Sequence, residues 1–522
     1  MTNASPGFRR PRLAALSPVL WAVISFALLL VPLSNDSIDM DESQTWDYAR
    51  LGTFSEFCHE LQTDNNSESQ MPLGMFSFWA WTRVFGTSEL GMRSLNLVWA
   101  AVILAAFAQV GRQLSIAWLP LLFAIQPFTW YCMNYARTPL MQMAGGALLL
   151  AGVVGYFRGR QCGEWVGLNL CIGAILLCGA SMLGLIPLSA IVAGLFVHGV
   201  LRKIRMSVAG KFLILFTLAI LSALGAYYAS TLFRGAGGAK LWAVSPANIL
   251  YVGYEFLGFQ GLGPGRQDLR AIIKGFVPAR DLLPFLSGLL VLAAAYFCIL
   301  VVAFKSWTTR TIQASLKKTQ ATPPTESKRH LFPLWLMSVG VPILSGGLLY
   351  LLATVVGFPF WGRHLSGAFP FWIVALAITI FWARQGIWRR VGRLATAGLL
   401  LLLLLSSLLV RFAPIHHHDD YRGAVAEARR LSSQEKIVWW VADHSGGAYY
   451  GLPFAKTFTN LPGEIQFSMN RTLPGTPGAV IISRPDNFDA LGTSTRLLAS
   501  GAYKKTRTLK SFEVWEKIPS PR

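Results

Sequence analysis

Charged side chains are scarce in this chain of 522 residues. They make up 14% of it, while hydrophobic residues make up 53%. Acidic residues are the scarcest of all: 25 Asp and Glu stand against 46 Lys and Arg, which gives a formal net charge of +21. The mean hydropathy is +0.46. Apolar runs of about 20 residues recur along most of the length, as a bilayer span requires. The composition therefore indicates a membrane protein.

Cysteine is also rare, with six in the whole chain. Four of them fall in or near apolar runs and are expected to be packing residues: Cys162, Cys171, Cys178 and Cys298. Cys58 and Cys132 fall in segments expected on the outer side of the membrane. A disulfide between these two is one alternative in an oxidising compartment, and two free thiols are the other.

Eleven apolar segments are expected to be membrane-spanning helices. The first lacks a small-residue cleavage pattern, which predicts an uncleaved anchor. The segments lie near residues 17–33, 90–110, 115–131, 138–157, 165–180, 182–200, 211–230, 284–304, 332–354, 366–383 and 394–412.

Lys and Arg are distributed unevenly between the connecting loops. If the N-terminus is cytoplasmic, most of the excess falls in loops on the inner side, for example at 9–12, 202–205 and 389–393. This is the positive-inside pattern, so the basicity sets the topology. Aromatic-basic interleaving is absent from these loops, so no nucleic-acid partner is expected. We expect a multi-pass protein of the cell (inner) membrane, surrounded by its lipids, with an extracytoplasmic C-terminus.

This orientation places two long loops outside, at 34–89 and 231–283, and two short turns, at 134–138 and 357–365. The charged residues that would share the outer face are Asp39, Asp41, Glu42, Arg137, Arg266 and Arg363. A shared face is necessary for a single active site, but it is not sufficient.

The segment Asp39-Met40-Asp41-Glu42 follows the first apolar run. A solvated loop is one interpretation of such a cluster. The other is chemical, because carboxylates at a membrane face are costly to desolvate. Residues 41–50 have helix-like spacing, and the aromatic stretch 72–85 is typical of an interfacial helix. A carboxylate pair held there could activate a hydroxyl group.

Several motifs on the expected outer face resemble those of the C-type (GT-C) glycosyltransferases. The closest group is glycosyltransferase family 39 with its bacterial relatives, the protein O-mannosyltransferases and the aminoarabinose transferases of lipid A. The motifs are Asp41-Glu42 with Tyr48-Ala49, Gln70-Met71-Pro72-Leu73, the segment 85–93, Tyr135-Ala136-Arg137, and Arg363-His364-Leu365 with Pro370.

The resemblance implies an enzyme of the cell envelope that moves a sugar, hexosyl or pentosyl, from a polyprenyl phosphate to an acceptor hydroxyl of a glycan, lipid or protein. Asp41 matches the general base, and Glu42 matches the neighbour that positions acceptor or metal. Arg137 and Arg363 are candidate clamps for the lipid phosphate, since guanidinium binds phosphate bidentately.

Further candidates for substrate binding are Asp39, Tyr135, His364 and Arg266. Arg266 ends the stretch Gly261-Leu-Gly-Pro-Gly-Arg266, which could let backbone amides approach a phosphate or could be a flexible turn.

Two departures from the family pattern affect the expected cofactor. Gln70-Met71 stands where the family often has His-Pro, and His364 stands where Tyr is usual. These changes leave both the metal and the acceptor open: no cofactor is certain, and a divalent metal is possible.

The last hundred residues differ in composition from the rest. A helical stretch at 421–431 precedes three apolar strands expected at 436–442, 478–483 and 512–516, which predicts a small α/β domain. We therefore expect a GT-C-like membrane catalytic domain at 1–412 and an extracytoplasmic α/β domain at 413–522. The segment His416-His417-His418-Asp419-Asp420 between them could bind a metal or be an exposed hinge, and the hinge is favoured.

Two other function classes compete with an enzyme. A transporter of eleven spans would bury ionisable residues near the bilayer midplane, whereas the spans here are almost free of charge. A non-catalytic membrane scaffold carrying the α/β domain would not need Asp41, Arg137 or Arg363, so substitutions at these three positions separate it from an enzyme.

Overall fold

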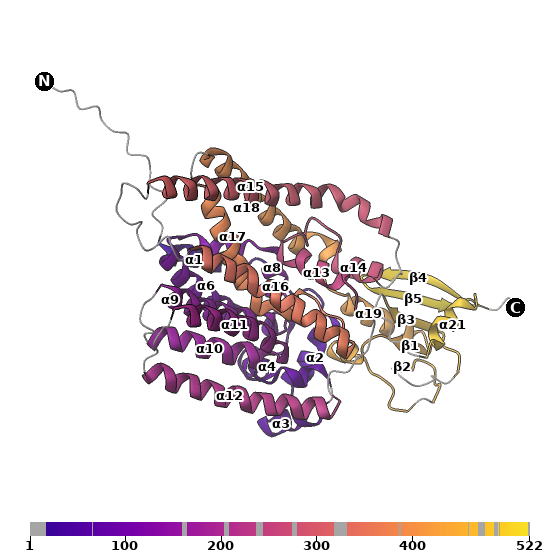
Figure 1. Ribbon diagram of the computed structural model, residues 1–522. Helices are drawn as coiled ribbons and strands as arrows, with labels where there is room; N and C mark the ends of the chain where they lie inside the picture. Colours follow the sequence, from indigo (N-terminus) through magenta and orange to yellow (C-terminus); the bar gives the residue numbers. More distant parts are fainter. Residues whose placement is uncertain are drawn as a thin grey trace.

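The computed structural model describes residues 17–519, with gaps at 65, 159–163, 203–207, 236–243, 274–278, 318–330, 386–387, 458, 468–474, 485–488 and 490. The basic cluster at 9–12, part of the one at 202–205, and Cys162 lie outside the described residues. A helical bundle forms most of the molecule, and a small sheet domain lies at one end of it (Figure 1).

Seven helical segments in the described part of the chain are long and apolar enough to cross a membrane. They correspond to α6 (Leu95–Leu114), α9 (Pro139–Phe157), α12 (Val208–Phe233), α15 (Leu286–Lys317), α16 (Leu331–Val356), α17 (Phe369–Ala383) with the preceding turn η6 (Gly362–Ala368), and α18 (Arg389–Phe412). Three shorter apolar helices accompany them: α1 (Pro18–Leu28), α10 (Glu164–Ala180) and α11 (Leu185–Arg202). The predicted polytopic helical fold with a small C-terminal sheet domain is confirmed.

The prediction of a continuous span at 115–131 is wrong. The chain forms two short helices there, α7 (Leu119–Ala124) and α8 (Pro127–Met133). Proline lacks a backbone N–H and pushes the preceding residue out of helical geometry, and Gln126 is extended at φ −82°, ψ 129°. The break lets α8 lead directly into the outer turn that contains Tyr135 and Arg137.

The centre of the bundle is formed by α9 and α17, the most deeply buried of the long helices. The turn η6 packs closely on α9, because a Cβ atom at Gly146 would lie only 2.1 Å from the Gly367 carbonyl oxygen. Glycine at this position allows the two backbones to approach. As a result, Arg363 at the start of η6 lies near the outer turn that precedes α9.

The first outer loop folds into α2 (Met40–Ala49), α3 (Phe54–Thr63), the short turn η2 (Ser67–Gln70) and α4 (Pro72–Phe85), followed by α5 (Glu89–Arg93). The second long outer loop contains α13 (Ala247–Phe256), α14 (Arg266–Ile273) and η4 (Ala279–Phe285). The aromatic side chains of Phe54, Phe57, Phe76 and Trp79 pack together between α3 and α4.

The C-terminal domain has a five-stranded sheet of order β2-β1-β3-β5-β4. β1 (Val438–Val441) runs parallel to β2 (Ile465–Phe467) and β3 (Ala479–Ser483), while β5 (Phe512–Lys517) is antiparallel to β3 and to β4 (Tyr503–Leu509). The helices are α19 (Tyr421–Ser433), α20 (His444–Tyr449) and α21 (Thr493–Ala499). The three predicted strands are confirmed. β2 is very short and β4 is largely exposed, so neither has a clear apolar pattern.

Cys58 and Cys132 are both free thiols.

Candidate active site

The acidic cluster at the start of α2 folds into a capped helix end. The Asp39 side chain accepts a hydrogen bond from the Glu42 backbone amide at 2.9 Å, and the Glu42 carboxylate accepts one from the Asp39 amide at 3.1 Å. This capping box satisfies amides that would otherwise lack partners. It also fixes Asp41, between the two capping residues, on the first turn of α2.

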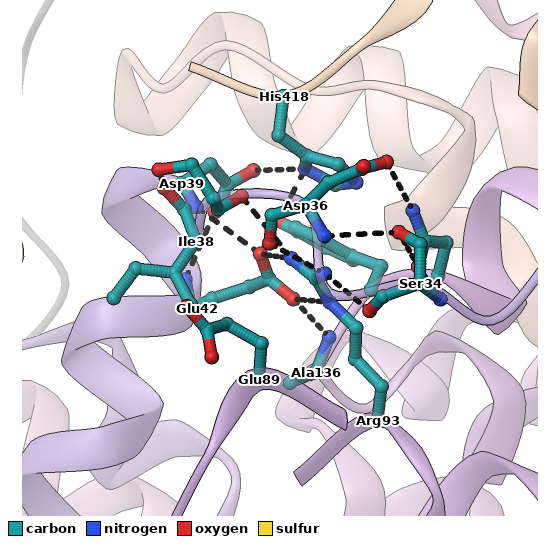
Figure 2. A network of polar contacts seen from close by, with 12 residues as sticks. Ser34, Asp36, Ile38, Asp39, Glu42, Glu89, Arg93, Ala136 and His418 are labelled. Carbon is teal, nitrogen blue, oxygen red and sulfur yellow. Dashed lines mark hydrogen bonds and ion pairs between the residues drawn. The ribbon is translucent and has the colours of Figure 1, made fainter. Parts of the chain in front are cut away.

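Glu42 lies in a fully buried network with Arg93 from α5 (Figure 2). The Arg93 guanidinium donates to both Glu42 carboxylate oxygens, at 2.8 and 2.7 Å, and to the Ser34 carbonyl at 3.0 Å. The Ala136 amide donates to Glu42 as well, at 2.7 Å. Glu42 thus joins three outer segments, and its burial favours a positioning role over direct contact with substrate.

Asp41 meets the predicted partners from the other outer turns. Its carboxylate accepts a hydrogen bond from the Tyr135 hydroxyl at 2.5 Å and forms an ion pair with Arg363. Arg137 donates to the Asp41 carbonyl at 3.0 Å. Burial alone would raise the pKa of Asp41, but the guanidinium groups of Arg363 and Arg137 outweigh burial and hold that pKa well below its usual range. The Asp41 carboxylate is therefore ionised.

Arg137 has a second acidic partner, Glu68 of η2, with which it forms a buried ion pair. Burial opposes the charged form of Arg137, yet the carboxylates of Glu68 and Asp41 raise its pKa. Because Glu68 neutralises it, Arg137 brings little free positive charge to a substrate anion. Glu68 belongs to no motif that the sequence analysis singled out.

Arg266, at the start of α14, lies in a different electrostatic setting. Its Nη1 atom contacts the Tyr131 hydroxyl, while Nε and Nη2 are buried without a hydrogen-bond partner among the described residues. Burial, followed by the like charges of Arg363 and Arg270, lowers the pKa of Arg266 well below its usual value. A buried guanidinium of this kind would be stabilised by an incoming anion.

A small cavity of about 40 Å³ borders this guanidinium. Its lining includes Arg266, Arg270, Tyr131, Asp39 and His418. The cavity therefore adjoins the residues that surround Asp41, and cationic side chains contribute to its wall.

The histidine segment lies partly within the site, so the prediction of an exposed hinge is wrong for His418. Its side chain is only 8% exposed and stacks against the rings of Tyr131 and Tyr135. Burial opposes its protonation, but the carboxylates of Asp39 and Glu42, with oxygens 3.8 and 3.7 Å from its Nδ1 atom, raise its pKa. His364 has a local role, since its Nδ1 atom accepts a hydrogen bond from the Trp361 amide at 3.0 Å.

Asp39, Glu42 and His418 present ligand atoms within 4.8 Å of one another, a spacing at which three side chains could hold a metal ion. However, Arg93 and the backbone amides of Asp39 and Ala136 already donate to both Glu42 oxygens. A divalent cation would have to displace the buried Arg93 guanidinium. The residues present therefore do not fit the possible divalent metal, and no step is assigned to one.

Two more residues of the site were missed at the sequence level. Arg93 ends the matched segment 85–93 but was given no role. Glu255 in α13 is 1% exposed and lies beside the Gly362 backbone. A signal for it existed, because Glu255 is the only acidic residue between Glu164 and Asp268.

Comparison with known proteins gives structural matches alone. No family model matches the chain, and no curated protein matches it. One similar solved structure is ArnT from Cupriavidus metallidurans bound to undecaprenyl phosphate, at 13% identity and a TM-score of 0.43, covering 96% of this chain and 98% of that one. Another is the same enzyme in the apo state, at 11% identity and a TM-score of 0.42, covering 97% and 99%.

Proposed function

We propose that the protein is a membrane glycosyltransferase that moves a sugar from a polyprenyl-phosphate donor to an acceptor hydroxyl at the outer face of the membrane. The observation that carries the proposal is the pairing of the Asp41 carboxylate with Arg363 and the Tyr135 hydroxyl. Beside this pair lies the buried guanidinium of Arg266, of which two nitrogens have no hydrogen-bond partner in the described part of the chain. A base next to a site for an anion is what transfer from a lipid phosphate requires.

Asp41 acts as the general base on the acceptor hydroxyl. In the resting site Arg363 keeps Asp41 ionised, which also makes it a weak base. When the donor phosphate binds, Arg363 is shared with the phosphate oxygens, and the pKa of Asp41 rises toward a value useful for proton transfer. The hydroxyl oxygen then attacks the anomeric carbon, the bond from that carbon to the phosphate oxygen breaks, Asp41 takes the hydroxyl proton, and polyprenyl phosphate leaves.

The leaving phosphate is held by Arg266 and Arg363, with Arg270 close by. Arg137, a predicted clamp, keeps the secondary role of holding the Asp41 backbone, because Glu68 already neutralises its charge. Tyr135 and His418 form an aromatic wall beside the cavity. The enzyme alternative is favoured over a scaffold, because a scaffold gives no reason for a buried arginine with two nitrogens that lack a hydrogen-bond partner among the described residues.

Deletion of the gene tests the proposal in the cell. We expect the polyprenyl-phosphate-linked sugar donor to accumulate, and expression of the wild-type chain to reverse the accumulation. Unchanged levels of every such lipid would contradict the proposal.

The expected orientation has its own test. A reporter that is active only in the cytoplasm, fused after Arg522, should be inactive. An active reporter would place the site on the wrong side of the membrane for this donor.

A further inference from the structure

Glu255 is a buried carboxylate for which the proposed reaction has no role. Its Oε2 atom accepts a hydrogen bond from the Gly362 backbone amide at 2.6 Å, and its Oε1 atom accepts one from the Gln260 side chain at 3.2 Å. Any side chain at position 362 would collide with it, since a Cβ atom there would lie 2.3 Å from Oε2. Glycine at 362 thus allows the carboxylate to reach the backbone immediately before Arg363.

The rest of α13 holds the same turn. Asn248 donates a hydrogen bond to the Phe360 carbonyl oxygen at 3.0 Å, and the Tyr251 ring packs edge-on against the Trp361 ring at 5.0 Å. Three successive residues of the turn, 360 to 362, are therefore each held by one side chain of α13.

The turn that α13 holds carries groups of the proposed site. Arg363 extends from it to Asp41 and to the Tyr135 hydroxyl. The Arg270 guanidinium lies over the Trp361 ring, 5.6 Å from its centroid. A displacement of the turn would therefore move the cation that controls Asp41.

We propose that Glu255 is a positioning residue that holds the Gly362 backbone so that Arg363 reaches Asp41. The effect of Glu255 on catalysis rests on the proposed function. The contact between Glu255 and the turn is independent of that function. Glu255 acts through the backbone of Gly362 and has no contact with the reacting groups.

The electrostatic surroundings agree with a neutral carboxyl group. Burial raises the pKa of Glu255 to about 8, and the hydrogen bond from Gly362 and the charge of Arg363 only partly oppose this. A protonated Glu255 leaves the positive charge of Arg363 undiminished for a phosphate. The titratable and charged groups that face Glu255 are Arg363, Arg270, Tyr251, Tyr254 and Cys132.

Two substitutions at Glu255 distinguish the position of its acceptor oxygen from the charge of its side chain. Glu255→Gln keeps the length and supplies a neutral oxygen acceptor for the Gly362 amide, so it should behave as wild type. Glu255→Asp keeps the carboxyl group but shortens the side chain by one methylene, so the acceptor is drawn away from Gly362. Glu427→Asp is the matched control, because Glu427 is also a buried glutamate (4% exposed) but lies in the C-terminal domain.

The measurements use the full-length protein in lipid nanodiscs. Amide exchange of the segment 360–365 should rise roughly fivefold in Glu255→Asp, since a hydrogen bond of about 1 kcal/mol is lost. The acid limb of the kcat/KM profile should also move to higher pH by about one unit, because Asp41 loses part of its cation. Besides Arg363, these variants leave unchanged the other titratable and charged groups that face Asp41, namely Arg137, Arg270, Tyr135, Asp39, Arg266, His364 and Asp443.

The outcomes test the proposed function and the positioning role of Glu255 separately. If exchange rises in Glu255→Asp but the wild type transfers no sugar, the proposed function fails and the contact stands. If Glu255→Asp matches Glu427→Asp in both the amide exchange of 360–365 and the acid limb, the inference is overturned. Loss of activity in Glu255→Gln with full activity in Glu255→Asp would also overturn it, since charge rather than position would then be required.

Discussion

The Arg93 guanidinium and the Glu42 carboxylate form a bidentate ion pair in which both side chains are fully buried. Arg93 also donates to the carbonyl oxygens of Ser34 and Asp36. The pair therefore ties the start of the first outer loop to the helix that follows it. Because Glu42 is the neighbour of Asp41 and closes the capping box of α2, this contact sets the direction in which Asp41 points.

Breaking this pair should destabilise the fold. Arg93→Met leaves the Glu42 carboxylate buried without its cation and should lower the free energy of unfolding by roughly 3–5 kcal/mol. Thermal unfolding in lipid nanodiscs measures the change. The control is Arg422→Met, which removes a half-exposed partner of Glu89 and should cost about 0–1 kcal/mol. Equal losses in the two variants would contradict the assignment of Arg93 as a structural anchor.

Arg363 and Arg137 should respond differently to substitution. Arg363→Lys keeps the charge but loses the fork that binds a carboxylate and a phosphate together, so turnover should fall by about tenfold or more while stability changes little. Arg137→Ala strands the buried Glu68 and should act mainly on stability, by roughly 3–5 kcal/mol. Transfer rates and unfolding temperatures of both variants provide the test. Full turnover in Arg363→Lys, or an unaltered unfolding temperature in Arg137→Ala, would contradict this division of roles.

Arg266→Gln should have opposite effects on stability and on donor binding. Removing a buried guanidinium that has two unpartnered nitrogens relieves a desolvation cost, so the unliganded protein should become more stable. Donor affinity should fall by about tenfold or more, because the phosphate loses a charged hydrogen bond of about 1.5–3 kcal/mol. Donor binding by the purified variant and its unfolding temperature measure the two effects. A variant that binds donor as well as wild type would exclude Arg266 from the phosphate site.

Asp443 lies where the C-terminal domain meets α2, and it should make the free energy of unfolding depend on pH. Its carboxylate accepts hydrogen bonds from Ser43 of α2 at 2.9 Å and from the Gly446 amide at 2.8 Å. Burial raises its pKa from 3.8 to about 6. The folded state therefore binds the proton more tightly than the unfolded state, and this contribution to stability is present below pH 4 and is lost as the pH rises through 6.

Asp443→Asn tests this dependence, because the amide oxygen keeps both acceptor contacts and cannot ionise. The variant should match wild type near pH 4 and exceed it above pH 7, by up to about 3 kcal/mol. Unfolding temperatures measured across pH 4 to 8 give the comparison. If the difference in unfolding temperature between the two proteins is constant over that range, Asp443 is not the source of the pH dependence.

The residues that form the centre of the site were predictable from the sequence because they are few and share one face. Asp41, Arg137 and Arg363 stand out in a chain with little charge, and the basic loops place them on the same side. Tyr135 was indicated by the motif that it shares with Arg137. The structure brings all four together. Topology alone could not say which cations are neutralised, since that depends on pairing across distant segments, as between Arg137 and Glu68.

Other features of the structure depend on packing that the sequence pattern does not encode. Hydrophobicity over 115–131 predicts a span, and only Pro127 hints at the break between α7 and α8. The segment 416–420 looks like a solvated linker, yet His418 stacks on two tyrosines that come from α8 and the turn after it. Glu255 has no motif around it, and its role became visible only beside Gly362.

Asp41 is the proposed base of a sugar transfer from a lipid phosphate. The most direct measurement is the release of polyprenyl phosphate and the transfer of sugar by protein reconstituted with a polyprenyl-phosphate sugar donor and an acceptor. Asp41→Asn removes the charge at constant size and should lower turnover by about 10²–10⁴-fold with the fold intact. Asp47→Asn, further along the same helix, should stay near wild type. Near wild-type turnover in Asp41→Asn would show that Asp41 is not the general base.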